Sequence, residues 1–372
     1  MLDSLARYDR QMRFAPIGKQ GQRRLSEAVV LIAGTGALGA ALAEHMARAG
    51  IGTVRLADRD YVELSNLQRQ RLFDEQDADQ GLPKAIAAAN KLRRINGEVR
   101  LEPHVVDLNG QSAYELAEGA ALVLDGTDNA AARFALSDAA YRLGIPYVYG
   151  GITAASGMSA TFVRGETACL RCAVGEEELA EGANCETAGI IAPIVELIAA
   201  VQAAETLKWL SGARDALRRT WLTAELWPFA VRETRMPLPV RDCPVCGDAR
   251  SGISAPYPAG DAEPERREGE EEWGAAVLCG RDSVQVTLGF ALPAAIELEQ
   301  RLRKLGCRTE RNPYLVRAWT LDGLKLVIFP EGRILVQGTG DPQAAKEACR
   351  RYLTMEPSAA TLTVREEMRV DA

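Results

Sequence analysis

The chain has 372 residues, 47% of them apolar, and a formal net charge of −7 at pH 7. This length is too great for one ordinary hydrophobic core and predicts at least two domains. The acidic balance and the lack of a Lys/Arg block exclude a nucleic-acid footprint. The N-terminus has no signal-peptide apolar segment, and the most apolar stretch, 190–210, carries Glu196 and Glu205. That stretch is typical of a buried or interface helix, so we expect a cytoplasmic protein without a membrane partner.

The first 150 residues predict strands that alternate with helices. Short apolar runs bounded by Gly or polar residues indicate strands, and apolar residues spaced three or four apart indicate helices. Strands are expected near 28–33, 53–58, 98–106, 120–129 and 146–150, and helices at 38–49, 83–95 and 129–143. Pro83 is expected at the first position of its helix. The alternation predicts an α/β, Rossmann-like, doubly wound and mostly parallel sheet whose ligand lies beyond the C-terminal strand ends.

The rest of the chain changes character twice. Short strands around the helix at 190–210 are expected to complete a first domain, 1–247. Residues 248–272 are rich in Pro, Gly and charge, which predicts a flexible linker. Residues 273–356 predict a small α+β domain, with a strand near 275–287, a helix at 291–305, strands near 308–337 and a helix at 341–354. Residues 357–372 are expected to form a tail.

A glycine-rich motif, GTGALG at 34–39, stands between the first strand and the first helix. Its glycines let the backbone approach phosphate groups at a helix N-terminus. Asp58, at the end of the second strand, is placed to bond ribose hydroxyls. The motif does not distinguish NAD from ATP, and a tight turn needed only for packing is the alternative interpretation.

A second polar motif, SNLQRQ at 65–70, adds groups that suit phosphate. Arg69 is a planar cation, and Asn66 can donate its amide. Lys84 begins a helix, where a cation opposes the helix dipole, so it is either a solvated surface residue or a phosphate ligand. Asp128 follows the fourth strand and suits Mg²⁺, or caps the next helix, or does both. Several cations with one acid favour a triphosphate and its metal.

Two CxxC pairs, CLRC and CPVC, supply four thiols. Cys169, Cys172, Cys243 and Cys246 have the number and spacing of a structural tetrahedral zinc site, whereas a redox dithiol would not need two pairs. Cys185 lies apart in a polar stretch and is a candidate nucleophile. Cys279, Cys307 and Cys349 are expected in the core. His45 and His104 have no partner pattern and are interpreted as structural.

These motifs together resemble the ThiF/MoeB family, relatives of the ubiquitin-activating enzymes. The resemblance runs in order through RYDRQ (7–11), GTGALG (34–39), DRDYVELSNLQRQ (58–70), Pro-Lys at 83–84, DGTDN (125–129), CLRC, NCETAG (184–189) and CPVC. It implies an adenylyltransferase that activates the C-terminal Gly-Gly carboxylate of a ubiquitin-like sulfur carrier protein. ATP and Mg²⁺ are used, pyrophosphate leaves, and a structural Zn²⁺ is retained.

The resemblance also implies roles for individual residues. Arg10, Arg69, Lys84, Asp128 and Cys185 would be catalytic, and Arg10 would reach the active site of the partner in a homodimer. The nucleotide would contact Gly34, Gly36, Ala37, Gly39, Asp58, Ser65, Asn66, Arg69, Lys84, Asp128 and Asn129. Position 37 is Ala where the family usually has Gly, which preserves a backbone contact.

Other questions stay open at this point. The pathway is thiamine-thiazole or molybdopterin synthesis, and Cys185 matches a cysteine that forms an acyl-persulfide in thiazole-pathway members. The sulfur donor would be a cysteine desulfurase or a rhodanese-type protein. Residues 273–356 resemble neither a rhodanese domain nor the ubiquitin-fold domain of the activating enzymes. The alternative functions are a non-catalytic scaffold for a ubiquitin-like partner and an NAD-dependent oxidoreductase with a structural zinc.

Overall fold

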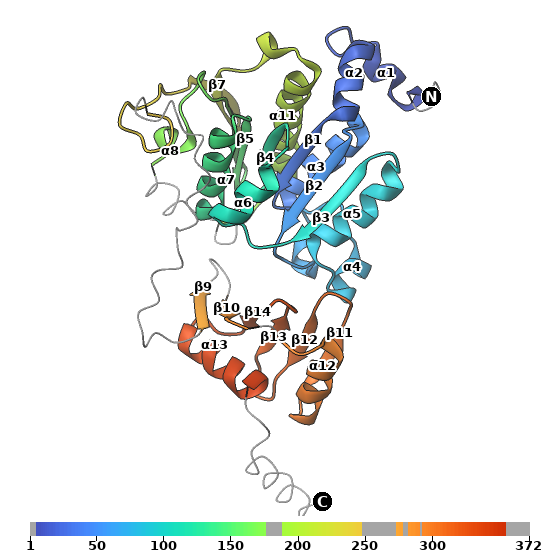
Figure 1. Cartoon of the computed structure of the whole chain (residues 1–372), viewed down its shortest axis with the longest axis vertical. Helices are drawn as coiled ribbons and strands as arrows, with labels where there is room; N and C mark the ends of the chain where they lie inside the picture. The colour runs from blue at the N-terminus through green and yellow to red at the C-terminus, as the bar shows by residue number, and fades with distance from the viewer. Residues whose placement is uncertain (1–4, 176–187, 248–272, 278–281, 291, 355–372) are drawn as a thin grey trace, which may run out of the picture. The chain divides into compact units, whose positions relative to one another are not determined.

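The computed structural model describes residues 5–175, 188–247, 273–277, 282–290 and 292–354 (Figure 1). The chain divides into two compact units, Met1–Pro264 and Glu265–Ala372. The proposed linker 248–272, the tail 357–372, Cys185 and Cys279 lie outside the described residues.

An eight-stranded sheet forms the centre of the first unit, in the order β3-β2-β1-β4-β5-β6-β7-β8. The strands from β3 through β5 pair in parallel, and β6, β7 and β8 continue the sheet antiparallel. Their bounds are β1 Val29–Ala33, β2 Thr53–Asp58, β3 Arg100–Val105, β4 Leu122–Asp125, β5 Tyr147–Thr153, β6 Ser156–Phe162, β7 Thr220–Leu226 and β8 Phe229–Arg235. The mostly parallel sheet confirms the predicted fold class.

Helices cover both faces of this sheet. On one face, the core joins β1, β2 and β4 to α3 (Ala37–Ala49), α5 (Lys84–Ile95) and α11 (Ala192–Ser211). On the other face it joins the same strands to α6 (Gly110–Ala117) and α7 (Ala130–Leu143). The other helices in the described part of the unit are η1 Ala6–Tyr8, α1 Asp9–Met12, α2 Gly18–Glu27, η2 Leu64–Asn66, α4 Glu75–Gln80, α8 Leu170–Ala173 and η3 Arg214–Ala216.

Local sequence signals set the helix ends. Gly50, Gly144 and Gly212 adopt positive φ values and terminate α3, α7 and α11, as a left-handed residue commonly does. Pro83 precedes α5 as its N-cap, one position earlier than expected, because Lys84 is the first residue with helical geometry. The strand predicted at 146–150 continues to Thr153 because it pairs with β6 along its whole length.

The second unit contains a six-stranded antiparallel sheet in the order β11-β12-β13-β14-β10-β9. The single strand expected at 275–287 is two paired strands, β9 (Trp273–Val277) and β10 (Ser283–Leu288). The remaining strands are β11 Arg308–Arg311, β12 Val316–Trp319, β13 Lys325–Ile328 and β14 Arg333–Gln337. Alternate strand residues pack against α12 (Ala295–Lys304) and α13 (Pro342–Cys349), which makes one core.

Two further expectations are settled by these elements. The helix predicted at 341–354 is α13 followed by a wider helical turn, Arg350–Thr354. Cys307 and Cys349 lie buried in the core, as expected. None of the helices in the described ranges is long and apolar enough to cross a membrane.

Candidate active site

The glycine loop Gly34–Thr35–Gly36 connects β1 to α3. Gly34 has φ of +78°, and a Cβ there would lie 2.7 Å from the Gly126 carbonyl oxygen. A Cβ on Gly39 would lie 1.7 Å from the Gly34 oxygen. Packing therefore explains Gly34 and Gly39. It does not explain Gly36, where a Cβ would meet only the Gln70 amide nitrogen, at 3.7 Å, so this position leaves the backbone accessible to a ligand.

Asp58 holds this loop in place from the C-terminal end of β2. Its Oδ2 accepts hydrogen bonds from Thr35 N at 2.6 Å and Thr35 Oγ1 at 3.0 Å. Its Oδ1 accepts a bond from Asp60 N at 2.7 Å. Burial raises the pKa of the Asp58 carboxyl, and the Lys84 cation opposes that rise. The two bonds from Thr35 occupy Oδ2, but Oδ1 accepts only one bond and has acceptor capacity left, so Asp58 can hold the loop and also bind a hydroxyl.

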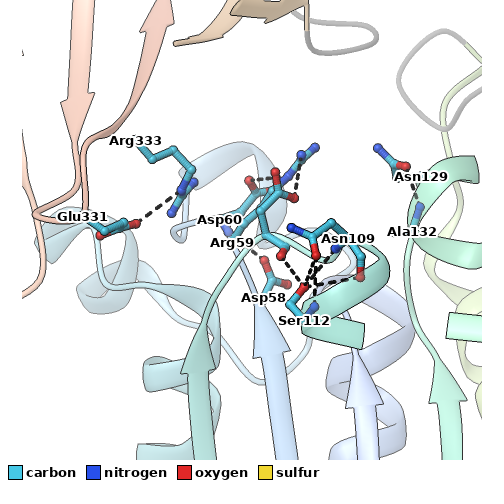
Figure 2. A network of polar contacts seen from close by, with 10 residues as sticks. Asp58, Arg59, Asp60, Asn109, Ser112, Asn129, Ala132, Glu331 and Arg333 are labelled. Atoms are coloured by element: carbon cyan, nitrogen blue, oxygen red, sulfur yellow. Dashed lines mark hydrogen bonds and ion pairs between the residues drawn. The ribbon is translucent and has the colours of Figure 1, made fainter. Parts of the chain in front are cut away.

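Lys84 is buried, with 6% of its side chain exposed, so the interpretation as a solvated surface residue is wrong. Its Nζ lies 3.2 Å from Asp60 Oδ2, and its backbone N–H donates to the Asp60 carbonyl at 2.8 Å. A buried lysine at a helix N-terminus is costly unless an anion compensates it. Asp60 supplies that anion in the free protein, next to Asp58 (Figure 2).

The segment 65–70 begins within a short 3-10 turn, η2, and extends beyond it. Asn66 is 1% exposed, and its Oδ1 accepts a bond from Glu63 N at 3.2 Å. Arg69 is half-buried and donates from Nη1 to the Ser65 carbonyl at 3.1 Å. Gln70 is buried and directs its amide nitrogen towards Gly36. This segment therefore brings the Gln70 amide donor to the glycine loop, with Arg69 as its neighbour in the sequence.

A buried polar network shapes the turn after β4. Asp125 accepts bonds from Thr127 N at 2.9 Å and Oγ1 at 2.7 Å, and from the Tyr147 hydroxyl at 2.8 Å. Arg133 lies 3.3 Å from Asp125 and donates to the Thr127 carbonyl at 2.7 Å. Burial raises the pKa of the Asp125 carboxyl, against the attraction of Arg133. The network fixes the loop that presents Asp128.

Asp128 itself is exposed beyond this turn. It does not cap α7: Asn129 is the N-cap, and its side chain accepts from Ala132 N at 3.0 Å (Figure 2). The alternative interpretation of Asp128 as the cap is therefore wrong. Burial lowers the pKa of the Arg59 guanidinium, but the negative charges of Asp107, Asp60 and Asp128 outweigh burial, so the pKa is raised. Asp58 and Asp128 thus lie at the ends of β2 and β4, the two strands that flank β1.

Arg10 projects from an N-terminal motif that is otherwise tied to the core. The Tyr8 ring is buried, and its hydroxyl accepts a bond from Asn96 Nδ2 at 2.8 Å. Gln11 donates to Gln22 Oε1 at 2.6 Å and to the Ala49 carbonyl at 3.1 Å. Arg10, between them on α1, is exposed. The motif therefore holds one arginine outward from a fixed base.

Sequence reasoning missed five residues that support this site. They are Thr35, Asp60, Gln70, Asp125 and Arg133. Thr35, Asp60, Gln70 and Asp125 lie inside motifs quoted in the sequence analysis, so their position was a usable signal. Arg133 lies outside these motifs, and its contact with Asp125 depends on the folded turn.

The four cysteines of the two CxxC pairs come together as predicted. Their sulfur atoms all lie within 4.8 Å of one another, with Cys169 and Cys243 at 3.6 Å and Cys172 and Cys246 at 3.5 Å. These separations are too long for disulfides and close to the sulfur spacing of tetrahedral zinc, whose Zn–S bonds are about 2.3 Å. Although burial opposes it, nearby backbone N–H groups lower the pKa of the Cys243 thiol to about 7. The donor set therefore fits a closed four-thiolate metal site.

Comparisons with known proteins agree with this arrangement. A model of the ThiF family matches residues 8–245. The chain is 39% identical to the sulfur carrier protein ThiS adenylyltransferase of Bacillus subtilis, over 93% of this chain and 99% of that protein. It is 36% identical to the sulfur carrier protein adenylyltransferase of Thermus thermophilus, over 66% of this chain and 92% of that protein. The crystal structure of E. coli MccB with ATP has the same fold, with a TM-score of 0.55 at 23% identity, over 65% of this chain and 74% of that one.

Proposed function

The chain belongs to the ThiF family, and we propose that it adenylates the C-terminal Gly-Gly carboxylate of a ubiquitin-like sulfur carrier protein. The observation that carries this proposal is the similarity to a ThiS adenylyltransferase along nearly the whole chain, including much of the second unit. The geometry of the site supports it, because the Gln70 amide faces Gly36 of an accessible glycine loop and the Lys84 cation attracts Asp58, which holds that loop.

Each group of the site has a task in this proposal. The backbone from Gly34 to Gly39, including Gly36 and Ala37, lies against the phosphates at the N-terminus of α3. Asp58 binds the ribose hydroxyls while it keeps its bonds to Thr35. Ser65, Asn66, Arg69 and Lys84 bind phosphate oxygens. When ATP binds, the Lys84 ammonium interacts with the phosphates and less strongly with Asp60.

Asp128, with the neighbouring Asn129, is proposed to bind the Mg²⁺ that accompanies ATP. The exposure of Asp128 supports this role. An exposed carboxylate is hydrated, and a hydrated cation can replace the water bound to it. Arg10 is proposed to complete the site of a second copy in a homodimer. Its outward position on a tied-down motif supports that role.

The reaction needs little acid–base chemistry from the protein. One oxygen of the carrier carboxylate attacks the α-phosphorus of ATP, and the bond from that phosphorus to the bridging oxygen breaks. The products are the acyl-adenylate and pyrophosphate. Because the carboxylate is already ionised at neutral pH, no general base is required. The barrier comes from bringing an anion to a polyanion, and fixed cations lower it.

The four-cysteine cluster is proposed to bind a structural Zn²⁺. Zinc would join Cys169 and Cys172, before the segment 176–187, to Cys243 and Cys246, after the last strand of the sheet. Four thiolates leave no open position for a water, so the metal stabilises the unit and takes no part in adenylation.

Later steps belong to the same proposal. The terminal sulfur of a persulfide on a cysteine desulfurase or a rhodanese-type protein in the cytoplasm would attack the acyl carbon and displace AMP, which leaves an acyl disulfide between carrier and donor. Cys185 is proposed to attack the acyl-side sulfur of this disulfide, which releases the donor thiolate and links Cys185 to the carrier. A further thiol would then attack the Cys185 sulfur, releasing the carrier thiocarboxylate for thiamine-thiazole or molybdopterin synthesis and leaving Cys185 in a mixed disulfide. The ThiS name of the relative that matches along most of the chain favours the thiamine side.

ATP–pyrophosphate exchange tests the proposal directly. The protein is assayed with each candidate sulfur carrier from the same cell, intact and without its terminal Gly-Gly. Exchange that requires one intact carrier is the expected result, and that carrier identifies the pathway. A zinc-loaded protein that binds ATP but shows no exchange with any carrier would instead be a scaffold. Stabilisation by NAD and not by ATP would indicate an oxidoreductase.

A further inference from the structure

Arg71, the residue immediately after the segment 65–70, joins two helices. Its Nε lies 2.9 Å from Glu44 Oε2 on α3, and its Nη1 lies 2.6 Å from Glu196 Oε2 on α11. α3 is the helix that begins at the glycine loop, and α11 packs against α3. Arg71 thus connects the segment 65–70 to the helix that carries the loop and to that helix's neighbour.

The backbone bonds of the segment 65–70 are local turn bonds. The Leu67 N–H donates to the Leu64 carbonyl, and the Arg69 and Gln70 N–H groups donate to the Asn66 carbonyl. Its position relative to the glycine loop therefore depends on side chains. Leu67, Leu72 and Phe73 pack into the core, but apolar contacts alone do not fix the rotation of a turn. Two directional ion pairs from Arg71 do.

A purely stabilising role does not account for this arrangement. Glu44 is the buried member of the network, with 10% of its side chain exposed, and Arg48 already neutralises it from one turn further along α3, at 2.6 Å. Arg71 and Glu196 are both 42% exposed, and exposed ion pairs add little stability. The distinctive feature of Arg71 is that it reaches across helices, whereas Arg48 stays on its own helix.

We propose that Arg71 is a positioning residue that fixes the phosphate-facing groups of segment 65–70 against the glycine loop through Glu44 and Glu196. The inference rests on the proposed adenylation and assigns to it a residue that touches neither ATP nor the carrier. Gln70, directly before Arg71, is buried with its amide 3.7 Å from the site of a Gly36 Cβ. A small rotation of the turn at Arg71 would therefore move both Arg69 and Gln70 relative to the phosphates.

The test compares Arg71→Met with Arg48→Met in the full chain. Both variants remove a cation that bonds Glu44 and retain a long apolar side chain, but only the first breaks the link to the segment 65–70. Carrier-dependent ATP–pyrophosphate exchange gives kcat and the KM for ATP, and thermal unfolding gives Tm. Arg71→Met is expected to lower kcat about tenfold and to raise the KM for ATP about twofold, because misalignment weakens ATP binding slightly and is felt most in the transition state.

Two further variants separate positioning from folding. Arg71→Lys keeps one ion pair and is expected to recover part of kcat, and Glu196→Gln is expected to give an intermediate loss. Salt screens half-exposed pairs, so raising ionic strength should lower the wild-type rate more than that of Arg71→Met. All variants are expected to keep Tm within about 3 °C of the wild type, as befits exposed ion pairs.

Equal kcat and KM in Arg71→Met and Arg48→Met would overturn the inference. So would a loss of activity in Arg71→Met that follows a lower Tm and is not recovered by Arg71→Lys. If the wild type shows no exchange with any carrier, the proposed function fails, and ATP binding is then compared by calorimetry. Weaker ATP binding in Arg71→Met than in Arg48→Met would still support positioning, whereas equal binding, or a wild type that binds no ATP, would end it.

Discussion

The candidate site has a buried half and an exposed half. Asp58, Asn66 and Lys84 are at most 8% exposed, and each has a protein partner. Arg10 and Asp128 are exposed, and Arg69 is half-buried. The buried groups are hydrogen-bonded or ion-paired before any ligand arrives, and together with the glycine loop 34–39, which Asp58 holds, they form a rigid frame. In the proposed function, the exposed groups remain solvated until ATP, Mg²⁺ or a second copy replaces water. The two halves should therefore respond differently to substitution.

The largest effect is expected from Gly39→Ala in the frame. The new Cβ would lie 1.7 Å from the Gly34 carbonyl oxygen, so the loop and the start of α3 must move apart. Unfolding free energy should fall by about 3 kcal/mol, as in severe overpacking, and ATP binding should be lost. Urea denaturation and calorimetry measure the two effects. Gly97→Ala, where a Cβ meets only one atom at 3.8 Å, is the control. Unchanged ATP binding in Gly39→Ala would contradict the role of the rigid frame in ATP binding.

Lys84→Met should separate chemistry from stability within the buried half. It removes a fixed cation near the phosphates, which is expected to lower kcat/KM about 10²- to 10³-fold. The fold should tolerate it, because Asp60 keeps contact with solvent and with Arg59. Lys91→Met is the matched control on the same helix, since Lys91 pairs with Asp77 away from the glycine loop. Similar exchange rates for the two variants would show that Lys84 does not act on the phosphates.

In the exposed half, Asp128→Asn should change metal dependence and leave stability unchanged. Exchange is expected to fall about tenfold to a hundredfold, and half-maximal activity should need more Mg²⁺. Tm should stay within about 1 °C, because Asn129, and not Asp128, caps α7. Asp215→Asn, another exposed acid in the same unit, serves as the control. A Mg²⁺ dependence equal to that of the wild type would show that Asp128 does not bind the metal.

The smallest effect on stability is expected at His45, which lies on α3. Burial, and then the Arg71 charge, lowers its pKa below the usual 6.5. The native state therefore binds fewer protons than the unfolded state, and stability present above pH 6.5 is lost as pH falls through the folded pKa. His45→Gln should flatten this dependence between pH 7 and 5. Urea denaturation across that range measures it, and an unchanged slope would contradict the assignment.

The residues of the candidate site and of the cysteine cluster differ in how far the sequence predicted their positions. Motif residues such as Gly34, Asp58 and the four cysteines were predicted because local spacing determines their geometry. Lys84 remained ambiguous because its compensation comes from Asp60, 24 residues away. Asp125 and Arg133 were missed because only the folded turn joins them. The alternative interpretation of Asp128 placed the cap of α7 one residue early, since Asp and Asn are equally good caps and the sequence offers both.

The cysteine cluster has a consequence for the order of synthesis. Its paired ligands are 74 residues apart, and the second pair ends at Cys246. At about 5–20 residues per second, roughly 4–15 s separate the first thiol from its partner on the ribosome. The strands and helices around the glycine loop are complete before the cluster can bind its metal. Zinc would therefore lock a nucleotide-binding core that already exists, and scarcity of the metal would arrest the newly made protein at that late stage.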